Sequence, residues 1–84
     1  MATKEPYSLR ESDQFAEHIG DLIGGFPYWD RVAMAVTWAL AQDPLAWPEI
    51  EGTHLRAIPI AILGRAIYYQ VDEESRMVTL EALF

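Results

Sequence analysis

Apolar residues in the first third of the chain recur at the spacing of an α-helix. They lie at intervals of four, three and one, which places on one helical face Phe15, Ile19, Leu22 and Ile23. The pattern predicts a helix over residues 12–24, with Ser12 or Asp13 as its N-cap. The segment Gly24–Pro27 should end this helix, because two glycines release the chain and a proline favours a new helix start.

A second helix is predicted over residues 28–42, and its apolar positions cover more than one side. One stripe, directed at a core, comprises Trp29, Val32, Ala33, Val36 and Leu40. The other side is apolar as well, through Met34, Ala35, Trp38 and Ala39. A helix that is apolar on most sides is usually buried on two faces. We therefore expect one face to meet the first helix and a sheet, and the other face to be available to a partner.

The periodicity changes from helical to alternating after the loop "QDPLAWPEIEG". The segment Thr53–Ile58 is typical of a strand, which Pro59 should interrupt, and Arg65–Val71 is rich in β-forming residues. In Met77–Leu83 the alternation continues, with one face formed by Val78, Leu80 and Ala82. A turn at Asp72–Ser75 is predicted to join the last two strands in a hairpin.

These segments predict the order β-α-α-β-β-β, once a short first strand over Tyr7–Arg10 is added. The expected fold is α+β, with two helices packed on one face of a small, mostly antiparallel sheet. Residues 1–84 should form a single domain, in which residues 1–6 are frayed. The last strand, Met77–Leu83, is expected at a free edge of the sheet that can accept another strand.

The composition excludes some kinds of covalent or metal cross-link in this small domain, and it also limits the kinds of partner that the domain can bind. Hydrophobic residues make up 51% of the chain and cysteine is absent, so disulfides and thiolate metal sites are excluded. Small domains without such cross-links often gain stability from a partner. The formal charge of −7, with six scattered Lys and Arg residues, opposes binding to phosphate backbones. No apolar run is long enough to span a membrane and no signal peptide is evident, so a cytoplasmic location is expected.

The order β-α-α-β-β-β and several short motifs in and before the stretch "RAIYYQVDEESRMVTL" resemble those of the RelE/ParE toxin superfamily of bacterial toxin–antitoxin systems, and the resemblance covers most of the chain. In the stretch "RAIYYQVDEESRMVTL", Tyr69, Val71 and Asp72 match the family's Tyr, Val and Asp. Val78 and Leu80 match its last strand, and further matches upstream are Pro44, Gly52, Leu55 and Arg56. The resemblance implies the family's fold and a role as the toxin of a type II pair, with a small antitoxin as partner.

The ribosome-dependent ribonucleases of this superfamily carry an Arg three residues before the Tyr of their Tyr-x-Val motif. Here that position is Ala66, and Arg65 lies one residue away. A shift of one residue moves a strand side chain to the opposite face of the sheet. The family's basic residues on the preceding strand are replaced by "AIPIAIL", and its basic segment after the last strand has no match before Phe84. RNA cleavage needs a base, an acid and cations, so we assign no catalytic residue and expect no RNA cleavage by the isolated protein.

Two groups of residues are candidates for contact with other molecules. Arg56 and Arg65 are the candidates for contact with a cellular target, and the simpler alternative is that they are solvated strand charges paired with carboxylates. Met34, Trp38 and Trp47 are the candidates for a partner interface, because Trp is enriched at interaction hot spots. For the tryptophans the alternative is that they fill the core.

The two histidines could in principle act as a general base or bind a metal ion, but their positions in the sequence do not favour either role. His18 and His54 lie on separate predicted elements, and no HExxH spacing is present. Surface or capping roles are favoured for both. We predict no metal site and no cofactor.

The function that these patterns favour is a toxin-like component of a type II toxin–antitoxin system, acting through protein–protein binding. The expected partner is a cognate antitoxin or a second copy of the chain. Direct nucleic-acid binding is not expected, because a surface with a charge of −7 favours a neutral or basic protein segment. Two alternatives stay open: a ribosome-dependent mRNA endoribonuclease with an unusual cation arrangement, and a non-toxic interaction or adaptor module of the same fold.

Overall fold

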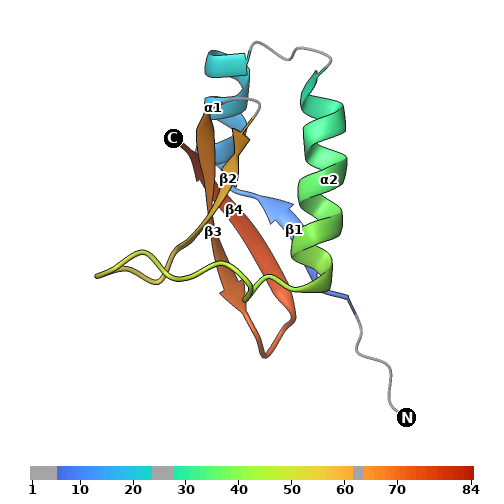
Figure 1. Ribbon diagram of the computed structural model, residues 1–84, viewed down its shortest axis with the longest axis vertical. Coiled ribbons are helices and arrows are strands. Elements are labelled where there is room, and N and C mark those ends of the chain that lie inside the picture. Colours follow the sequence, from blue (N-terminus) through green and yellow to red (C-terminus); the bar gives the residue numbers. More distant parts are fainter. Residues whose placement is uncertain (1–5, 24–27, 62–63) are drawn as a thin grey trace.

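The computed structural model describes residues 6–23, 28–61 and 64–84, and gives side chains outside residues 21–30. Its elements, drawn in Figure 1, are β1 (Ser8–Glu11), α1 (Asp13–Ile23), α2 (Tyr28–Gln42), β2 (Arg56–Ile60), β3 (Arg65–Asp72) and β4 (Met77–Leu83). The predicted order β-α-α-β-β-β is confirmed. The predicted helix stop at Gly24–Pro27 and most of the frayed segment 1–6 lie outside the described residues.

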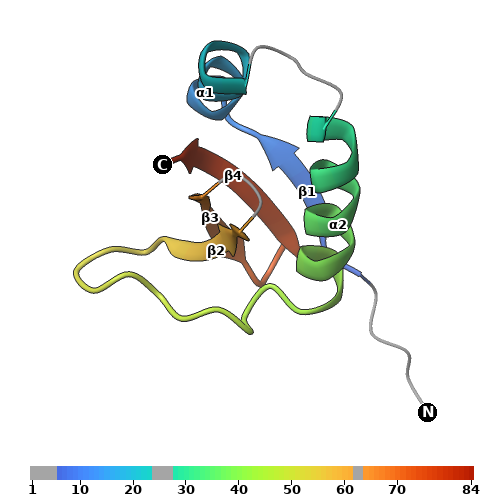
Figure 2. The same ribbon diagram turned by 45° about the horizontal axis from the view of Figure 1, so that its top comes forward.

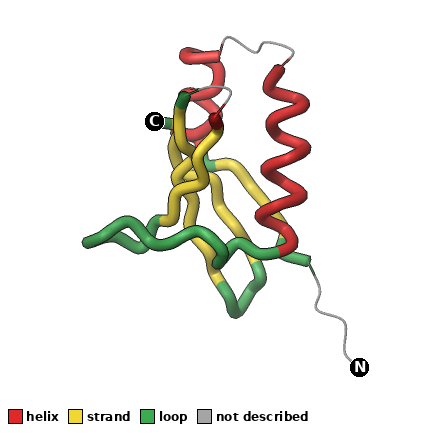
Figure 3. The backbone as a smooth tube through the Cα atoms, in the orientation of Figure 1, coloured by secondary structure: helices red, strands yellow, loops and turns green. Residues whose placement is uncertain are grey.

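The strands form one mixed sheet in the order β1-β4-β3-β2. The β2–β3 and β3–β4 pairs are antiparallel, and the β1–β4 pair is parallel. Figure 2 shows α1 near the end of β4 and α2 alongside β1, and Figure 3 shows the strands between these helices and the long loop that follows α2. The α+β class is therefore confirmed, with two helices covering a small sheet.

The last strand does not lie at an edge, and that expectation is wrong. β1 pairs with β4 in parallel from Ser8↔Met77 to Glu11↔Leu80, so β4 is enclosed by β1 and β3. A parallel pair needs a long crossover connection, which the intervening helices and strands provide. Within the described sheet, β1 and β2 are the edge strands.

The hairpin between β3 and β4 turns at the predicted place. Asp72 pairs with Met77, and its carboxylate accepts hydrogen bonds from the backbone N–H groups of Glu74 and Ser75 at 3.0 and 3.3 Å. These bonds, chiefly the one from Ser75, hold the pKa of Asp72 below its usual value. Arg76 completes the turn with a φ of 52°, in the left-handed region.

A β-bulge changes which residue at the end of β4 faces the core. The β3–β4 ladder shifts register between Tyr68 and Tyr69, which leaves Glu81 as an extra residue in β4. Leu83 consequently joins the core with 1% exposure. Ala82, which was predicted to continue the core face, is buried as well, but it stands opposite Tyr68.

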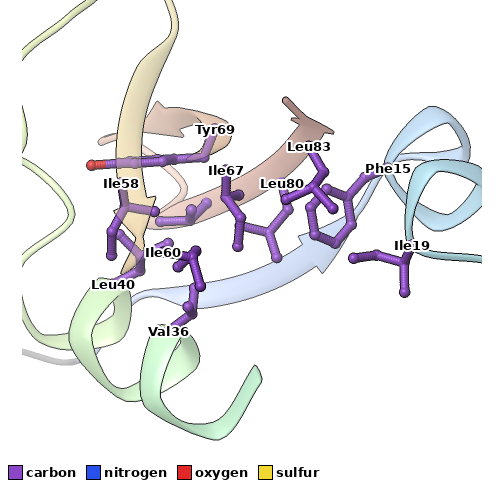
Figure 4. Close-up of a cluster of buried hydrophobic side chains, with 11 residues drawn as sticks. Phe15, Ile19, Val36, Leu40, Ile58, Ile60, Ile67, Tyr69, Leu80 and Leu83 are labelled. Carbon is purple, nitrogen blue, oxygen red and sulfur yellow. The ribbon is translucent and has the colours of Figure 1, made fainter. Parts of the chain in front are cut away.

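One hydrophobic core joins both helices to the sheet (Figure 4). α1 contributes Phe15 and Ile19, and α2 contributes Val36 and Leu40. The sheet contributes Ile58, Ile60, Ile67, Tyr69, Val78, Leu80 and Leu83. The predicted helical stripes are confirmed at Phe15, Ile19, Val36 and Leu40. The side chain of Trp29, predicted to lie in the core, is outside the described part.

A serine cap fixes the start of α1 against the sheet. The backbone N–H of Phe15 donates to Ser12 Oγ at 3.0 Å, which identifies Ser12 rather than Asp13 as the N-cap. The Ser12 hydroxyl donates in turn to the carbonyl oxygen of Glu81 at 3.0 Å. The cap therefore ties the first turn of the helix to β4.

Pro59 lies inside β2, opposite Ala66, and does not interrupt the strand as predicted. It is tolerated because β2 is an edge strand, where a missing N–H need not break the ladder. β2 begins at Arg56 rather than at Thr53. Thr53 belongs to a turn instead, in which its hydroxyl donates to the carbonyl oxygen of Ile50 at 2.8 Å.

Candidate functional site

The outer side of α2 presents large apolar side chains to solvent. Met34 is 75% exposed and Trp38 is 69% exposed. Together with Ala33 and Thr37 they line a shallow hollow of about 670 Å³. These residues are exposed because Val36 and Leu40 occupy the side of the helix that packs on the core. Large apolar side chains grouped in this way are typical of an interaction surface.

An apolar groove lies on the adjacent side of α2, between this helix and the edge strand β2. Its volume is about 320 Å³, and its lining is Val32, Ala35, Val36, Ala39, Ile58, Pro59 and Ile60. Ala35 and Ala39 contribute short side chains to the α2 side of this groove. The groove and the Met34–Trp38 surface therefore form neighbouring apolar features on one helix.

Trp47, the third interface candidate, lies elsewhere and packs partly buried against the core. Its carbonyl oxygen accepts a hydrogen bond of 2.6 Å from Arg56 Nη1, which also lies 3.5 Å from the carbonyl oxygen of Leu45. Arg56 thus has a definite structural role in holding the loop that follows α2. Sequence patterns did not predict this role of Arg56, because its hydrogen-bond partner is the backbone carbonyl group of Trp47 and not a carboxylate side chain.

Tyr69 holds the same loop from the core side. Its hydroxyl donates to the carbonyl oxygen of Pro44 at 2.6 Å, and Tyr69 itself is fully buried. Burial raises the pKa of Tyr69 to about 12, against a smaller lowering effect of Arg56. Because Tyr69 pairs with Arg56, the two side chains that fix the loop belong to one site on the sheet.

Arg56 and Arg65 do not form one target-contact patch. Arg56 pairs with Tyr69 and Arg65 pairs with Ile60, so the two arginines stand at opposite ends of the β2–β3 ladder. Arg65 is exposed at the beginning of β3. A joint role in binding one small target is therefore geometrically unfavourable.

The register of β3 also separates Arg65 from the position that the ribonucleases use. The β2–β3 pairing is uninterrupted from Arg65 to Tyr69. Strand alternation therefore places Arg65 on the face of the buried Ile67, and Ala66 on the opposite face. The bulge found in this hairpin lies farther on, between Tyr68 and Tyr69, and does not bring Arg65 to the face of Ala66.

His18 connects α1 to the end of β4. Its Nδ1 accepts a hydrogen bond of 3.1 Å from the backbone N–H of Leu83, and its ring packs edge-on against Phe84 with centroids 5.6 Å apart. This arrangement places the imidazole proton on Nε2. His54 is exposed in the loop before β2. In the described part of the chain, no three His, Cys, Asp or Glu side chains are grouped to hold a metal ion.

The face of the sheet away from the core carries a polar hollow of about 380 Å³. Its lining is Arg10, Gln70, Asp72, Ser75, Met77 and Thr79. Arg10 Nε donates to Thr79 Oγ1 at 2.9 Å, and its charge also lowers the pKa of Asp72 slightly. The guanidinium group of Arg10 therefore already interacts with other groups of the protein.

Comparison with solved structures assigns the architecture. A chain in the crystal structure of the intact Escherichia coli RelBE toxin–antitoxin complex matches with a TM-score of 0.72 and 14% identity, over 92% of this chain and 93% of that chain. A chain in the RelBE2 toxin–antitoxin complex from Mycobacterium tuberculosis matches with a TM-score of 0.70 and 17% identity, over 98% and 93%. The chain therefore has a RelE-like fold.

The comparisons of sequence found no match, in contrast to the comparison of structures. No family model matches the chain, and no curated protein matches it. None of the helices that the structure describes is both long and apolar enough to cross a membrane. The resemblance inferred from Tyr69, Val71 and Asp72 is thus supported by the backbone rather than by overall identity.

Proposed function

We propose that this protein is the toxin-like component of a type II toxin–antitoxin pair, and that it acts in the cytoplasm by binding another protein. The observation that carries the proposal is the exposed apolar surface of Met34 and Trp38 on α2. The two solved structures described above come from toxin–antitoxin complexes, which supports an antitoxin as the partner. Covering this surface with a partner removes apolar area from water at a gain of roughly 25 cal/mol per Å².

The positions of the arginines support binding over RNA cleavage. Phosphoryl chemistry needs cations directed at the developing charge. Arg56 is bound to a backbone carbonyl, Arg10 is bound to Thr79, and Arg65 lies on the face of the sheet opposite Ala66. No described arginine is therefore at the position that the resemblance assigns to the ribonuclease cation.

Expression of the protein in bacteria, alone and with the product of the small neighbouring reading frame, tests the proposal. We expect slower growth with the protein alone, relief by the neighbour, and a complex of the two that survives size-exclusion chromatography. Transcripts should stay intact in the arrested cells. Ribosome-dependent cleavage that disappears in Arg65→Ala would favour the endoribonuclease, whereas normal growth and no complex would favour the adaptor.

A further inference from the structure

All of the sulfur in this chain belongs to methionine. The sequence has three methionines and no cysteine. The structure describes the surroundings of two of them. Met34 is 75% exposed on the outer side of α2, whereas Met77 is half-buried in β4, a strand enclosed by β1 and β3. In the described part of the chain, Met34 is therefore the methionine that lies most open to an oxidant in solution.

Met34 also lies within the apolar surface on the outer side of α2. Together with Ala33, Thr37 and Trp38 it lines the hollow of about 670 Å³. Met34 and Trp38 are four residues apart on a helix, so their side chains are neighbours on its surface. None of these four lining residues is charged. The polarity of this surface therefore depends strongly on the side chain at position 34.

Oxidation by a peroxide changes this side chain from apolar to polar. Hydrogen peroxide transfers one oxygen atom to the thioether sulfur, so that an S–O bond forms and the peroxide O–O bond breaks. The sulfur is oxidised, the peroxide is reduced, and the second peroxide oxygen leaves as water with both protons. The sulfoxide is polar and chiral. Its oxygen accepts hydrogen bonds from water, and these are lost at a cost when an apolar partner surface covers it.

We propose that Met34 is a site of reversible oxidation to methionine sulfoxide, and that this modification weakens the binding of the partner protein to the outer side of α2. This inference rests on the proposed function and adds redox control to the surface that the function uses. A bound partner covers Met34, so the oxidant acts on the free protein and prevents its capture. Methionine sulfoxide reductases restore the thioether, and the binding with it.

The place of Met34 in the fold allows binding to change while the fold is kept. α2 is attached to the core through Val36 and Leu40, and Met34 is not a member of that core. Oxidation at an exposed position away from the core should leave the free energy of unfolding nearly unchanged. A loss of affinity with an unchanged denaturation midpoint therefore reports on the binding surface itself.

The rate of oxidation tests the site. The purified protein is treated with hydrogen peroxide, and peptide mapping by mass spectrometry follows the gain of one oxygen atom at each methionine. Met34 should react several-fold faster than Met77, and the neighbouring reading frame's product should slow the reaction at Met34. Fragment spectra distinguish Met34 from Trp38 on the same tryptic peptide. Faster reaction at Met77, or no protection of Met34 in the complex, contradicts the inference.

Titration calorimetry with the neighbouring reading frame's product tests the consequence. The protein oxidised at Met34 should bind at least tenfold more weakly than the untreated protein. Treatment with reductases for both sulfoxide epimers should restore the affinity. Equal affinities before and after oxidation at Met34 overturn the inference.

Three variants assign the effect to one sulfur atom. Met34→Leu keeps an apolar side chain that peroxide does not oxidise, so it should bind like the parent protein both before and after treatment. Met34→Gln carries a polar side chain of similar length and should bind weakly without any peroxide. Met77→Leu is the matched control, which should stay as sensitive to peroxide as the parent. A peroxide-dependent loss of binding in Met34→Leu would assign the effect to another residue, against the inference.

The outcomes separate this inference from the proposed function. Untreated protein that binds the neighbour, with an affinity that oxidation at Met34 does not change, overturns the redox control and leaves the proposed function standing. Untreated protein that does not bind the neighbour overturns the proposed function, and with it the partner on which the redox control acts.

Discussion

The Tyr69 hydroxyl donates a hydrogen bond of 2.6 Å to the carbonyl oxygen of Pro44, and this bond fixes the long loop to the sheet. Both residues are buried. The donor lies in the middle of β3, and the acceptor follows the end of α2. This one bond therefore links the loop that follows α2 to β3, one of the two inner strands of the sheet.

Removal of the Tyr69 hydroxyl should destabilise the protein, because the carbonyl oxygen of Pro44 then has no hydrogen-bond donor. Tyr69→Phe is expected to lower the free energy of unfolding by about 1–2 kcal/mol, because the buried Pro44 carbonyl loses its partner. Tyr69→Ala should cost roughly 3–5 kcal/mol, because it also leaves a cavity. Chemical denaturation measures both changes. Equal midpoints for Tyr69→Phe and the parent protein would contradict the role of the bond.

Alkaline pH should destabilise the protein through the same residue. The pKa of Tyr69 is raised from 10.0 to about 12 by burial. Between these two values the unfolded chain has lost the tyrosine proton that the folded chain still binds, so stability is complete below pH 10 and falls as the pH rises. Unfolding followed at several alkaline pH values should show this loss, and Tyr69→Phe should reduce it.

Asp72 should titrate below the usual range of an aspartate, because backbone N–H groups in the hairpin turn bind its charged form. A carboxylate whose pKa is lowered stabilises the fold above its unfolded value of 3.8, and this contribution is lost as the pH falls through the folded value. Carboxyl chemical shifts from NMR should give a midpoint below 3.8. Asp72→Asn is the comparison that keeps an acceptor without the charge.

His18 should be replaceable by asparagine but not by alanine. The Leu83 N–H donates to His18 Nδ1 at 3.1 Å, and the Oδ1 atom of asparagine occupies a similar position along the side chain. We expect His18→Ala to speed hydrogen exchange of the Leu83 amide and to cost roughly 1 kcal/mol of stability. His18→Asn should keep more of the protection. Equal exchange in the two variants would show that the ring packing against Phe84 is what matters.

Charged substitutions on the outer side of α2 should affect binding and spare the fold. Trp38→Glu and Met34→Glu alter side chains that are 69% and 75% exposed, so the free energy of unfolding should change by about 0.5 kcal/mol or less. Both should weaken the complex with the neighbouring reading frame's product. Gln70→Glu adds the same charge on the exposed far side of the sheet and serves as the control.

Local patterns predicted the elements of this fold better than their arrangement. α2 has the predicted limits, Tyr28–Gln42, because helical spacing is a property of neighbouring residues. The central position of β4 depends on pairing between Arg10 and Thr79, which are 69 residues apart, and no periodicity encodes it. The bulge that moves Leu83 into the core is likewise a property of two strands together.

The candidate site was predictable only in part, for the same reason. The exposed Met34 and Trp38 follow from their positions off the core stripe of α2. The groove beside them is lined by residues of both α2 and β2, and sequence spacing cannot indicate that these two elements come together. The tie from Arg56 to the Trp47 carbonyl is equally non-local.

The parallel pairing of β1 with β4 determines when the protein can finish folding during its synthesis. β1 is made before its partner strand, Met77–Leu83, and two helices and two strands are translated between them. Until β4 leaves the ribosomal exit tunnel, the nascent chain has no central strand on which β1 and β3 can assemble. The sheet therefore closes only after α1, α2, β2 and β3 have all been translated, and until then the apolar faces of α1 and α2 are without the surface that covers them.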